Sequence, residues 1–427
     1  MSLEQAFSDA MHKLNITKSE PLAVAVSGGA DSMSLTILTN KWSEYPIKAL
    51  TVDHKLRQES AEEAIQVGRQ LKELNIEHHI LNIKPDSIKS NIQATARDIR
   101  YKLMTDYCIV NNIKYLLVAH NKEDQAETVL IRLMRGSGVN GLCGMENKIH
   151  LNNITIIRPL LSINKYKLTQ YLKENNVNWV EDPSNKDDKY LRSKIRKFIQ
   201  SEQEVDLLVD RLAKTAENMQ RSRLYIEDKI SEEMQLVTSF RPEGYCVVNI
   251  KEFRKLHTES AYRILSALLK AIGGKYYKTR FEKLDNLYIN IMQNNKVTPV
   301  TLAGCQIYTS GKKNESENLI IIREIADITD KQPIVADNES VIWDNRFYCT
   351  LDNQNGEFYI SSIGKEGLKN ILSQTKDILK NANLSKKIIY GLPALHNFHR
   401  IIAAPHINYY ENDSLKANFK VELTLKF

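Results

Sequence analysis

Short apolar runs alternate with longer helical patterns along the first part of the chain. The apolar runs are rich in β-branched residues, and between them apolar residues recur three and four positions apart, as in strands separated by amphipathic helices. The predicted strands are 22–26, 47–53, 76–83 and 113–120, and the predicted helices are 33–42, 59–74, 91–104 and a segment from 122 onward. This alternation predicts an α/β fold with a doubly wound, mainly parallel sheet in residues 1–202.

The second part of the chain carries different patterns. A helical periodicity from 203 to 237 and two further helical segments predict a helical domain at 203–297, followed by a strand-rich connection at 298–354. Residues 355–427 combine one helix with short strands and predict a small α+β domain. A chain of 427 residues has room for about two or three domains, which agrees with this division.

The first predicted strand ends in a turn with almost no side-chain bulk. The turn and the start of the next helix comprise Ser27, Gly28, Gly29, Ala30, Asp31 and Ser32. At such a junction the free backbone N–H groups and the positive end of the helix dipole converge on one point. The sequence therefore predicts a phosphate-binding loop, although serine caps around a tight glycine turn would also satisfy the pattern.

These six residues also narrow the nucleotide chemistry. They lack the Gly-Lys-Ser/Thr ending of a Walker A motif and the three spaced glycines of a Rossmann fingerprint. They resemble the SGGxDS signature of the PP-loop ATP pyrophosphatases, which implies that ATP is cleaved between its α and β phosphates and that AMP is left on an oxygen of the substrate. An aspartate beside phosphates requires a divalent cation between them, so Asp31 implies Mg²⁺.

Polar residues also follow the second and third predicted strands, toward the edge where open α/β sheets bind ligands. Asp53 and His54 end the second strand, and the resemblance implies that they hold adenine and ribose; strand-end caps are the alternative. Arg97 shares a helix face with Arg100 and Tyr101. This segment resembles the N-x-x-x-x-A-R-x-x-R-Y pattern of one PP-loop branch, which implies that Arg97 contacts phosphate or RNA, whereas a solvated stripe is the ordinary explanation.

The fourth predicted strand ends at His120, and Asn121 is placed to cap the helix that follows. Asp124 and Glu127 lie on one face of that helix. The stretch AHNKEDQAETVLIRLMRGSGVNGLCGM resembles another PP-loop segment. The resemblance implies that His120 and Asp124 belong to the active site, with Asp124 as second metal ligand or proton acceptor, and that Glu127 meets a cationic amine.

A further stretch discriminates most strongly among PP-loop branches. Residues 179–185 read WVEDPSN, and Arg192 and Arg196 follow. They resemble the W-x-x-D-x-S-N and R-N-x-[IL]-R motifs that close the catalytic domain of the tRNA(Ile)-lysidine synthetases. Ser193 stands where that family usually carries asparagine, which leaves any amide contact at this position in doubt.

Basic residues at other positions suit an RNA partner. Arg132 and Arg135 flank a flexible Gly-Ser-Gly loop that suits an RNA backbone, with a plain helix surface as the alternative for Arg132. Lys386 and Lys387 resemble a lysine pair in the small C-terminal domain of the same family, thought to clamp the acceptor end of the tRNA. The RNA-binding prediction thus covers Arg132, Arg135, Arg192, Arg196, Lys386 and Lys387.

The resemblance implies a specific reaction. The wobble cytidine of the CAU-anticodon isoleucine tRNA is adenylated by ATP with Mg²⁺, and the ε-amine of free lysine displaces AMP to form lysidine. The catalytic residues implied are Asp31, Arg97, His120, Asp124 and Glu127. A sulfur-transferring PP-loop enzyme, an amide-forming synthetase, and a tRNA-binding protein with a relic nucleotide site are the alternatives.

Composition adds few constraints. The five cysteines are far apart and form no CxxC pair, which argues against sulfur transfer, disulfides and zinc or iron–sulfur sites. The net charge of +7 permits a polyanionic partner without requiring one. No signal peptide or membrane span is apparent, so we expect a cytoplasmic protein that makes no membrane contact, with a homodimer as a further expectation.

Overall fold

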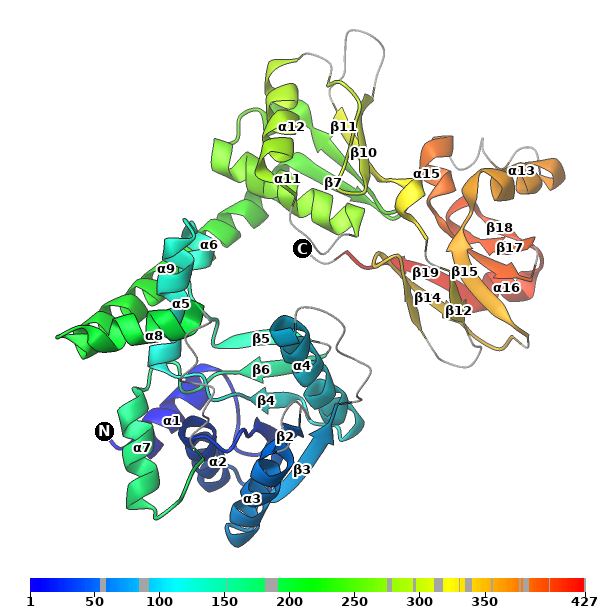
Figure 1. Ribbon diagram of the computed structural model, residues 1–427. Coiled ribbons are helices and arrows are strands. Elements are labelled where there is room, and N and C mark those ends of the chain that lie inside the picture. The colour runs from blue at the N-terminus through cyan, green and yellow to red at the C-terminus, as the bar shows by residue number, and fades with distance from the viewer. Residues whose placement is uncertain are drawn as a thin grey trace. The chain divides into compact units, whose positions relative to one another are not determined.

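The computed structural model of the chain is shown in Figure 1. It describes residues 1–53, 59–83, 92–151, 153–180, 191–274, 279–294, 297–310, 318–329, 331–334, 340–354, 356–375, 378, 384–398 and 400–425. These residues divide into two compact units, Met1–Tyr225 and Ile226–Phe427, and the division falls inside one long helix, α9 (Val205–Val237). No described helix is both long enough and apolar enough to span a lipid bilayer.

The first unit is built on a six-stranded sheet with the order β3-β2-β1-β4-β6-β5. The strands are β1 (Leu22–Ala25), β2 (Lys48–Asp53), β3 (Glu77–Asn82), β4 (Tyr115–Leu117), β5 (Lys148–Leu151) and β6 (Ile154–Ile157). All neighbouring pairs are parallel except β5 with β6. The predicted doubly wound, mainly parallel α/β fold is therefore confirmed, and the antiparallel edge strand β5 is an addition that the sequence analysis did not predict.

Helices cover both faces of this sheet (Figure 1). α1 (Leu3–Lys13), α2 (Ala30–Trp42), α3 (Glu59–Glu73) and α7 (Lys165–Glu174) share the core on one face, and α4 (Ile92–Val110) packs on the other. Three further helices, α5 (Lys122–Met134), α6 (Val139–Leu142) and α8 (Leu191–Ser201), form a separate group with α9 (Figure 1). Alternate residues of the strands pack on opposite faces: Val24 joins the core formed with α1, α2 and α7, whereas Ala23 joins the core formed with α4. This alternation follows from the period of two along a strand.

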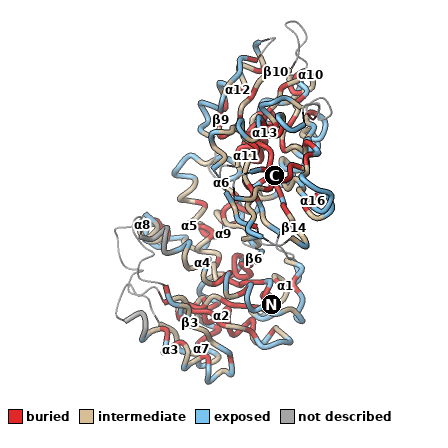
Figure 2. The backbone as a smooth tube through the Cα atoms, turned by 90° about the vertical axis from the view of Figure 1, so that its right-hand side faces the viewer, coloured by how far each residue is buried: buried red, intermediate tan, exposed pale blue. Residues whose placement is uncertain are grey.

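Helix α2 is buried around most of its circumference, because it lies between the sheet and α7 (Figure 2). Its buried hydroxyl groups are satisfied locally. Thr36 Oγ1 donates to the Ser32 carbonyl at 2.7 Å, and Thr39 Oγ1 donates to the Leu35 carbonyl at 2.7 Å. These bonds to the preceding turn let the two threonine side chains enter the core with their hydroxyl groups satisfied.

The second unit begins with a five-stranded antiparallel sheet of order β7-β8-β11-β10-β9. Its elements are β7 (Thr238–Arg241), β8 (Tyr245–Asn249), α10 (Ile250–Phe253), α11 (Thr258–Gly273), α12 (Phe281–Gln293), β9 (Val300–Leu302), β10 (Cys305–Ser310) and β11 (Asn318–Arg323). β8 pairs with β11, for example Val248 with Leu319. The segments 203–297 and 298–354, described above as a helical domain and a connection, therefore share one sheet.

The remainder of the second unit contains two smaller antiparallel sheets with the orders β12-β15-β16-β17-β18 and β13-β14-β19. Their strands are β12 (Gln332–Ile334), β13 (Val341–Trp343), β14 (Phe347–Leu351), β15 (Phe358–Ser362), β16 (Pro393–Asn397), β17 (Arg400–Ala404), β18 (Tyr409–Tyr410) and β19 (Phe419–Leu423). The helices are α13 (Gly364–Gln374), α15 (Lys386–Tyr390) and α16 (Asp413–Asn418). Because β14 pairs with β19 along its whole length, the last strand of the chain completes a sheet that starts before residue 355.

Candidate active site

The loop between β1 and α2 has the geometry expected of a phosphate site. Gly28 has φ +83°, and a Cβ atom there would lie 2.7 Å from Val67 Cγ2, so only glycine fits. The Gly28 carbonyl accepts a hydrogen bond of 2.9 Å from the backbone N–H of Val180. The stretch that resembles the family motif therefore reaches this loop at Val180, whereas residues 181–185 of the motif lie outside the described part of the chain.

Gly29 is the N-cap of α2, and no side chain caps the helix. Ser32 Oγ instead donates to the Gly29 carbonyl at 2.9 Å and accepts from the Ser27 N–H at 3.2 Å. The two serine hydroxyls are also 3.2 Å apart. The serines thus brace the turn from inside and leave the first N–H groups of α2 for an anion.

Asp31 lies in the first turn of α2, and its environment is unusual for a carboxylate. Its Oδ1 atom is buried and has no hydrogen-bond partner within the described residues. Burial raises the pKa of Asp31, the Asp124 charge raises it further, and Lys165, Asn121 and Arg196 oppose the shift. A buried carboxylate oxygen without a partner fits a cation ligand, because a cation would supply the missing interaction.

Asp124 approaches Asp31 from the start of α5. Asn121 caps this helix: its Oδ1 accepts from the Asp124 N–H at 2.9 Å, and Asp124 Oδ2 accepts from the Asn121 N–H at 3.2 Å. The reciprocal bonds fix the Asp124 carboxylate at the N-terminus of α5. Across the described residues, no group of three or more His, Cys, Asp and Glu side chains is placed to hold a metal. Two carboxylates are still sufficient for Mg²⁺, which usually keeps water and substrate phosphate as its other ligands.

Glu127 lies one turn further along α5 and is held by two arginines of α8. Arg192 Nε donates to Glu127 Oε2 at 2.8 Å, and Arg196 Nε donates to Glu127 Oε1 at 2.7 Å. Arg192 also donates to Asp124 Oδ1 at 2.9 Å. Only 4% of the Glu127 side chain is exposed, whereas 42% of the Arg192 side chain is exposed. Glu127 is therefore a buried carboxylate that holds Arg192 in place while the Arg192 side chain remains partly exposed to solvent.

His120 follows β4, and Arg158 follows the neighbouring strand β6. Arg158 Nε donates to His120 Nδ1 at 3.2 Å. Burial, and then Arg158, Arg97, Arg192 and Arg100, lower the pKa of His120 to about 3. Arg97 and Arg100 both lie over the ring of Tyr101, at 5.1 and 5.6 Å. His120 is therefore neutral and surrounded by arginines, an electropositive environment that suits a phosphoryl group.

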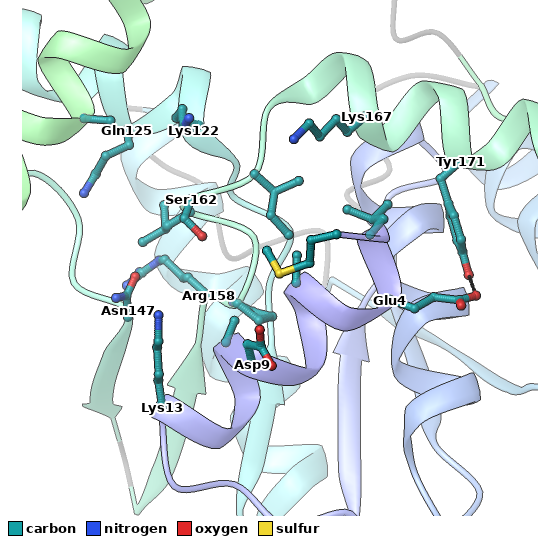
Figure 3. Close-up of a pocket in the computed structure, with 18 of the residues that line it drawn as sticks. Glu4, Asp9, Lys13, Lys122, Gln125, Asn147, Arg158, Ser162, Lys167 and Tyr171 are labelled. Atoms are coloured by element: carbon teal, nitrogen blue, oxygen red, sulfur yellow. Dashed lines mark hydrogen bonds between the residues drawn. The ribbon is translucent and has the colours of Figure 1, made fainter.

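A pocket of about 1200 Å³ opens next to these residues within the first unit (Figure 3). α1, α7 and α9 contribute to its lining, together with residues 158–163. Arg158 lines the pocket and also donates a hydrogen bond to His120, so this side chain links the pocket to the His120 imidazole. Glu4 and Lys13 lie on the α1 side in Figure 3, and Lys122 and Gln125 on the α5 side.

Other predicted site residues occupy varied positions. Asp53 is 4% exposed at the end of β2, and His54 lies outside the described residues. Arg132 Nη1 donates to the carbonyls of Gly141 and Gly144 at 2.9 and 2.6 Å, so it holds the segment that follows the Gly-Ser-Gly loop, and its contact with RNA stays a prediction. Arg135 is exposed at the end of α5.

Lys386 and Lys387 lie in the second unit, at the exposed start of α15. Lys387 Nζ lies 5.3 Å from the centre of the Tyr308 ring. Both lysines stay a prediction for RNA binding.

The sequence analysis missed three contributors to the site. Arg158 and Lys165 were not among the predicted site residues, and Asn121 was predicted only as a helix cap. The signal for Arg158 was present: an arginine directly after a buried β-branched run, at the edge where the loop and His120 were already expected. Lys165 opens α7, and its proximity to Asp31 depends on a contact across many residues that no local pattern indicates.

Comparison with known proteins gives consistent matches. A family model described as a PP-loop domain matches residues 2–203. A tRNA(Ile)-lysidine synthase of Wolbachia pipientis wMel is 38% identical over 419 residues, which cover 96% of this chain and 94% of that protein. The tRNA(Ile)-lysidine synthase of Orientia tsutsugamushi (strain Boryong) is 33% identical over 431 residues, covering 97% of this chain and 96% of that protein.

A solved structure, the U34-tRNA thiolase NcsA from Methanococcus maripaludis, is more distant. It is 18% identical with a TM-score of 0.44, covering 51% of this chain and 77% of that chain. These values are too low for the likeness to indicate a shared activity.

Proposed function

Since this chain belongs to the tRNA(Ile)-lysidine synthase family, the resemblance in its motifs is confirmed, and we propose that it joins free lysine to the wobble cytidine of the CAU-anticodon isoleucine tRNA. ATP is the co-substrate, and AMP and pyrophosphate are the products. The match runs along nearly the whole chain, so the proposal includes the second unit as part of the enzyme.

The reaction proceeds in two balanced steps. The carbonyl oxygen at position two of the cytosine ring attacks the α phosphorus, the bond between the α phosphorus and the bridging oxygen breaks, and pyrophosphate leaves. The lysine ε-amine then attacks the same ring carbon, the carbon–oxygen bond breaks, and AMP leaves with that oxygen. As the carbon–nitrogen bond forms, the neutral amine gives up one proton to a base and keeps the other, so carbon two of the ring has exchanged oxygen for nitrogen.

The phosphate loop supports the first step. The N–H groups at the start of α2 and the Gly28–Gly29 turn provide donors for phosphate oxygens. Mg²⁺ would be held by Asp31 and Asp124 and would neutralise phosphate charge at this edge of the sheet. Arg97 and His120 face the same region and favour the negative charge that develops on the transferred phosphoryl group.

The second step needs an unprotonated amine, although the pKa of a free lysine side chain is about 10.4. Asp124 and Glu127 are the carboxylates available to accept or position it. Both Glu127 oxygens already accept hydrogen bonds from arginines, so we assign to Glu127 the positioning of Arg192. Asp124 also accepts hydrogen bonds at both oxygens, from Arg192 and from the Asn121 N–H, but only one of these partners is a guanidinium. Its side chain is 17% exposed against 4% for Glu127, so Asp124 is the more accessible of the two carboxylates for taking the amine proton.

The tRNA is expected to contact basic groups in both units. Arg135 in the first unit and the lysine pair of α15 in the second are exposed and suit phosphates. Arg192 and Arg196 are mainly anchored in the site, so their contribution to RNA binding would be made by the exposed part of Arg192. We further propose a cytoplasmic location, which matches the expected substrate, and a homodimer remains a prediction.

The sulfur-transfer alternative has little support from the cysteines. All five are buried, and none of them forms a disulfide. Burial raises the pKa of Cys108 to about 12, and Cys143, near α5, donates its thiol to the Val139 carbonyl at 3.1 Å. Thiols in these environments are poor nucleophiles.

One observation carries the proposal: a phosphate loop that includes Asp31, whose Oδ1 is buried without a partner among the described residues, lies at the same sheet edge as Asp124 and His120, in a chain that matches the family over 96% of its length. The test is incorporation of radiolabelled lysine into an unmodified CAU-anticodon isoleucine transcript with Mg²⁺-ATP. Label, AMP and pyrophosphate should appear in equal amounts.

Transcripts with another anticodon serve as the control and should take up no lysine. AMP release that depends on a sulfur donor or on another tRNA would keep the nucleotide chemistry and overturn the substrate. Absence of ATP turnover with every tRNA would instead favour a binding protein with a relic nucleotide site.

A further inference from the structure

Arg158 is one of the few buried arginines in the first unit, with 6% of its surface exposed. It follows β6, and its guanidinium is fixed at two positions. Nε donates to His120 Nδ1 at 3.2 Å, and Nη1 donates to the Glu146 carbonyl at 2.7 Å. Its backbone N–H donates to the Asn147 carbonyl at 2.8 Å, which holds the residue in register. The guanidinium therefore meets the imidazole from a rigid support.

This contact determines the tautomer of His120. A guanidinium has donors and no acceptor, so the nitrogen facing it must carry a lone pair. A neutral imidazole has one donor and one acceptor, and with Nδ1 accepting, the hydrogen is on Nε2. The lone pair that a general base would use on Nδ1 is already engaged by Arg158.

The surroundings of His120 support the same assignment. Arg158 from the end of β6, Arg97 and Arg100 from α4, and Arg192 from α8 all disfavour a second proton on the ring, in addition to the effect of burial. A ring that stays neutral among cations can donate one hydrogen bond from Nε2 without adding another positive charge. Phosphoryl and other anionic oxygens are the natural acceptors in such an environment.

We propose that Arg158 is a positioning residue that locks His120 as the Nε2–H tautomer, so that His120 serves as a neutral hydrogen-bond donor to an anionic oxygen of the nucleotide and not as a general base. This inference rests on the proposed function, because it specifies how one residue of that site acts. No proton changes place at His120 during the reaction.

Two readouts test it. The first is independent of turnover: long-range ¹H–¹⁵N NMR of the unliganded full-length protein, with the His120 signals identified by their loss in His120→Gln. His120 should show the Nε2–H pattern from about pH 5 to about pH 8. Arg158→Met should lose that pattern, giving mixed tautomers or an imidazolium near neutral pH, and Arg158→Lys, which keeps a donor, should largely retain it.

Arg254→Met is the matched control, since Arg254 also donates to backbone carbonyls, those of Ile291 and Asn294, but lies in the second unit. It should leave the His120 signals unchanged. If Arg158→Met does not fold, the wild-type spectrum and Arg158→Lys still decide the question. An Nδ1–H tautomer or an imidazolium in the wild-type protein near neutral pH would overturn the proposal.

The second readout is the rate of AMP formation with tRNA. A glutamine amide nitrogen can replace Nε2 of histidine, whereas an asparagine amide nitrogen replaces Nδ1. His120→Gln should therefore stay within about tenfold of wild type, and His120→Asn should lose about 10²–10³-fold. Equal losses in both variants, or a pH profile controlled by His120, would favour a base and contradict the assignment.

The two readouts also separate this inference from the proposed function. If wild type forms no lysidine but the tautomer follows Arg158, the proposed substrate is wrong and the positioning role stands. If lysidine forms but the tautomer ignores Arg158, only the positioning role fails.

Discussion

The two units treat buried aspartates in opposite ways. In the second unit, Asp344 is 5% exposed and accepts hydrogen bonds from Arg323 Nη2 at 2.9 Å and from Arg346 Nε at 2.8 Å. Arg323 also donates to the Gly273 carbonyl at 2.7 Å, and Arg346 donates to the Gly244 carbonyl at 3.1 Å. Every charge in this cluster has partners, and the cluster joins β11 to the β13–β14 turn.

Asp31 in the first unit is a carboxylate with weaker compensation: Lys165, Asn121 and Arg196 offset only part of the effect of burial. Its Oδ1 lacks a partner among the described residues, and burial raises its pKa. A satisfied buried charge indicates a structural role, whereas an unsatisfied one indicates a group kept ready for a ligand. The comparison predicts that neutralising Asp31 costs activity and not stability, and that neutralising Asp344 does the reverse.

The largest expected effect is on turnover in Asp31→Asn. AMP formation should fall by about 10³-fold or more, because a metal ligand at the phosphates is lost, while tRNA affinity stays within a few fold. Asp106→Asn, an exposed α4 position, is the control and should retain activity. If Asp31→Asn formed AMP at a rate near that of wild type, Asp31 would not be a ligand of the catalytic Mg²⁺.

The same variant should be more stable than wild type. Because the pKa of Asp31 is raised in the folded protein, the native state binds this proton more tightly than the unfolded chain, and stability falls as the pH rises above the ordinary aspartate range. Asp31→Asn removes the buried charge, so the free energy of unfolding should rise by about 1 kcal/mol near neutral pH. At low pH, where Asp31 is protonated in wild type, the difference should vanish. Chemical denaturation without Mg²⁺ measures it, and a loss of stability would mean that Asp31 is structural.

Asp344→Asn should give the largest change in stability. Two buried guanidiniums would lose their counter-charge, and such a loss typically lowers the free energy of unfolding by about 3–5 kcal/mol. Trp343 is fully buried next to Asp344, while Trp42 and Trp179 lie in the first unit. Fluorescence unfolding in a Trp42→Phe, Trp179→Phe background therefore reports on the second unit alone.

Asp228→Asn, at an exposed position of α9 in the second unit, is the matched control. It should change the unfolding midpoint of the second unit little. If Asp344→Asn lowered the free energy of unfolding by less than about 1 kcal/mol, the two arginines would have found other acceptors. Asp344 would then not be a structural counterpart to Asp31.

The sequence predicted the first unit much better than the second, for physical reasons. The strand–loop–helix at Leu22–Ser32 is a local pattern, because an apolar run and two glycines specify it without distant contacts. The edge strand β5 was not predicted from the sequence, because its four residues KIHL form a short segment with a polar exposed face. The pairing of β8 with β11 joins residues about seventy positions apart, which no local periodicity indicates.

The two aspartates show the same limit at the level of single residues. Asp344 and Asn345 both have positive φ in the turn between β13 and β14, and the sequence Asp-Asn is typical of such turns. The turn was therefore predictable from sequence, but the approach of Arg323 was not. For Asp31 the motif indicated its role, whereas the unpartnered oxygen is a property of the assembled site.

A smaller effect on activity is expected for a carboxylate that is buried with hydrogen-bond partners and also lies in the active site. Glu127 is buried like Asp344 and lies in the active site like Asp31. Glu127→Gln should lower ligation about 10–100-fold by loosening Arg192, and raising the pH should not restore the rate, because Glu127 does not take the amine proton. Asp124→Asn should be partly rescued at high pH, where free lysine deprotonates. Alkaline rescue of Glu127→Gln instead would reassign the proton acceptor.

The smallest effect is expected from a test of tRNA binding by the second unit, whose buried Asp344, Arg323 and Arg346 all have partners within that unit. Deleting residues from 355 onward is a poor test, because it removes β19 from its pairing with β14 and the Gly391 carbonyl from Arg346. Replacing exposed Lys386 and Lys387 with alanine leaves those contacts intact.

The double substitution should weaken tRNA binding about three- to tenfold, and the slope of log affinity against log salt should fall by about one to two, as expected for the loss of one or two phosphate contacts. Lys416→Ala with Lys420→Ala removes the same charge from other exposed positions of this unit. A general electrostatic effect would move both pairs equally, whereas a specific clamp moves only the α15 pair. A change confined to the KM for tRNA, with kcat unchanged, would separate binding by the second unit from chemistry in the first.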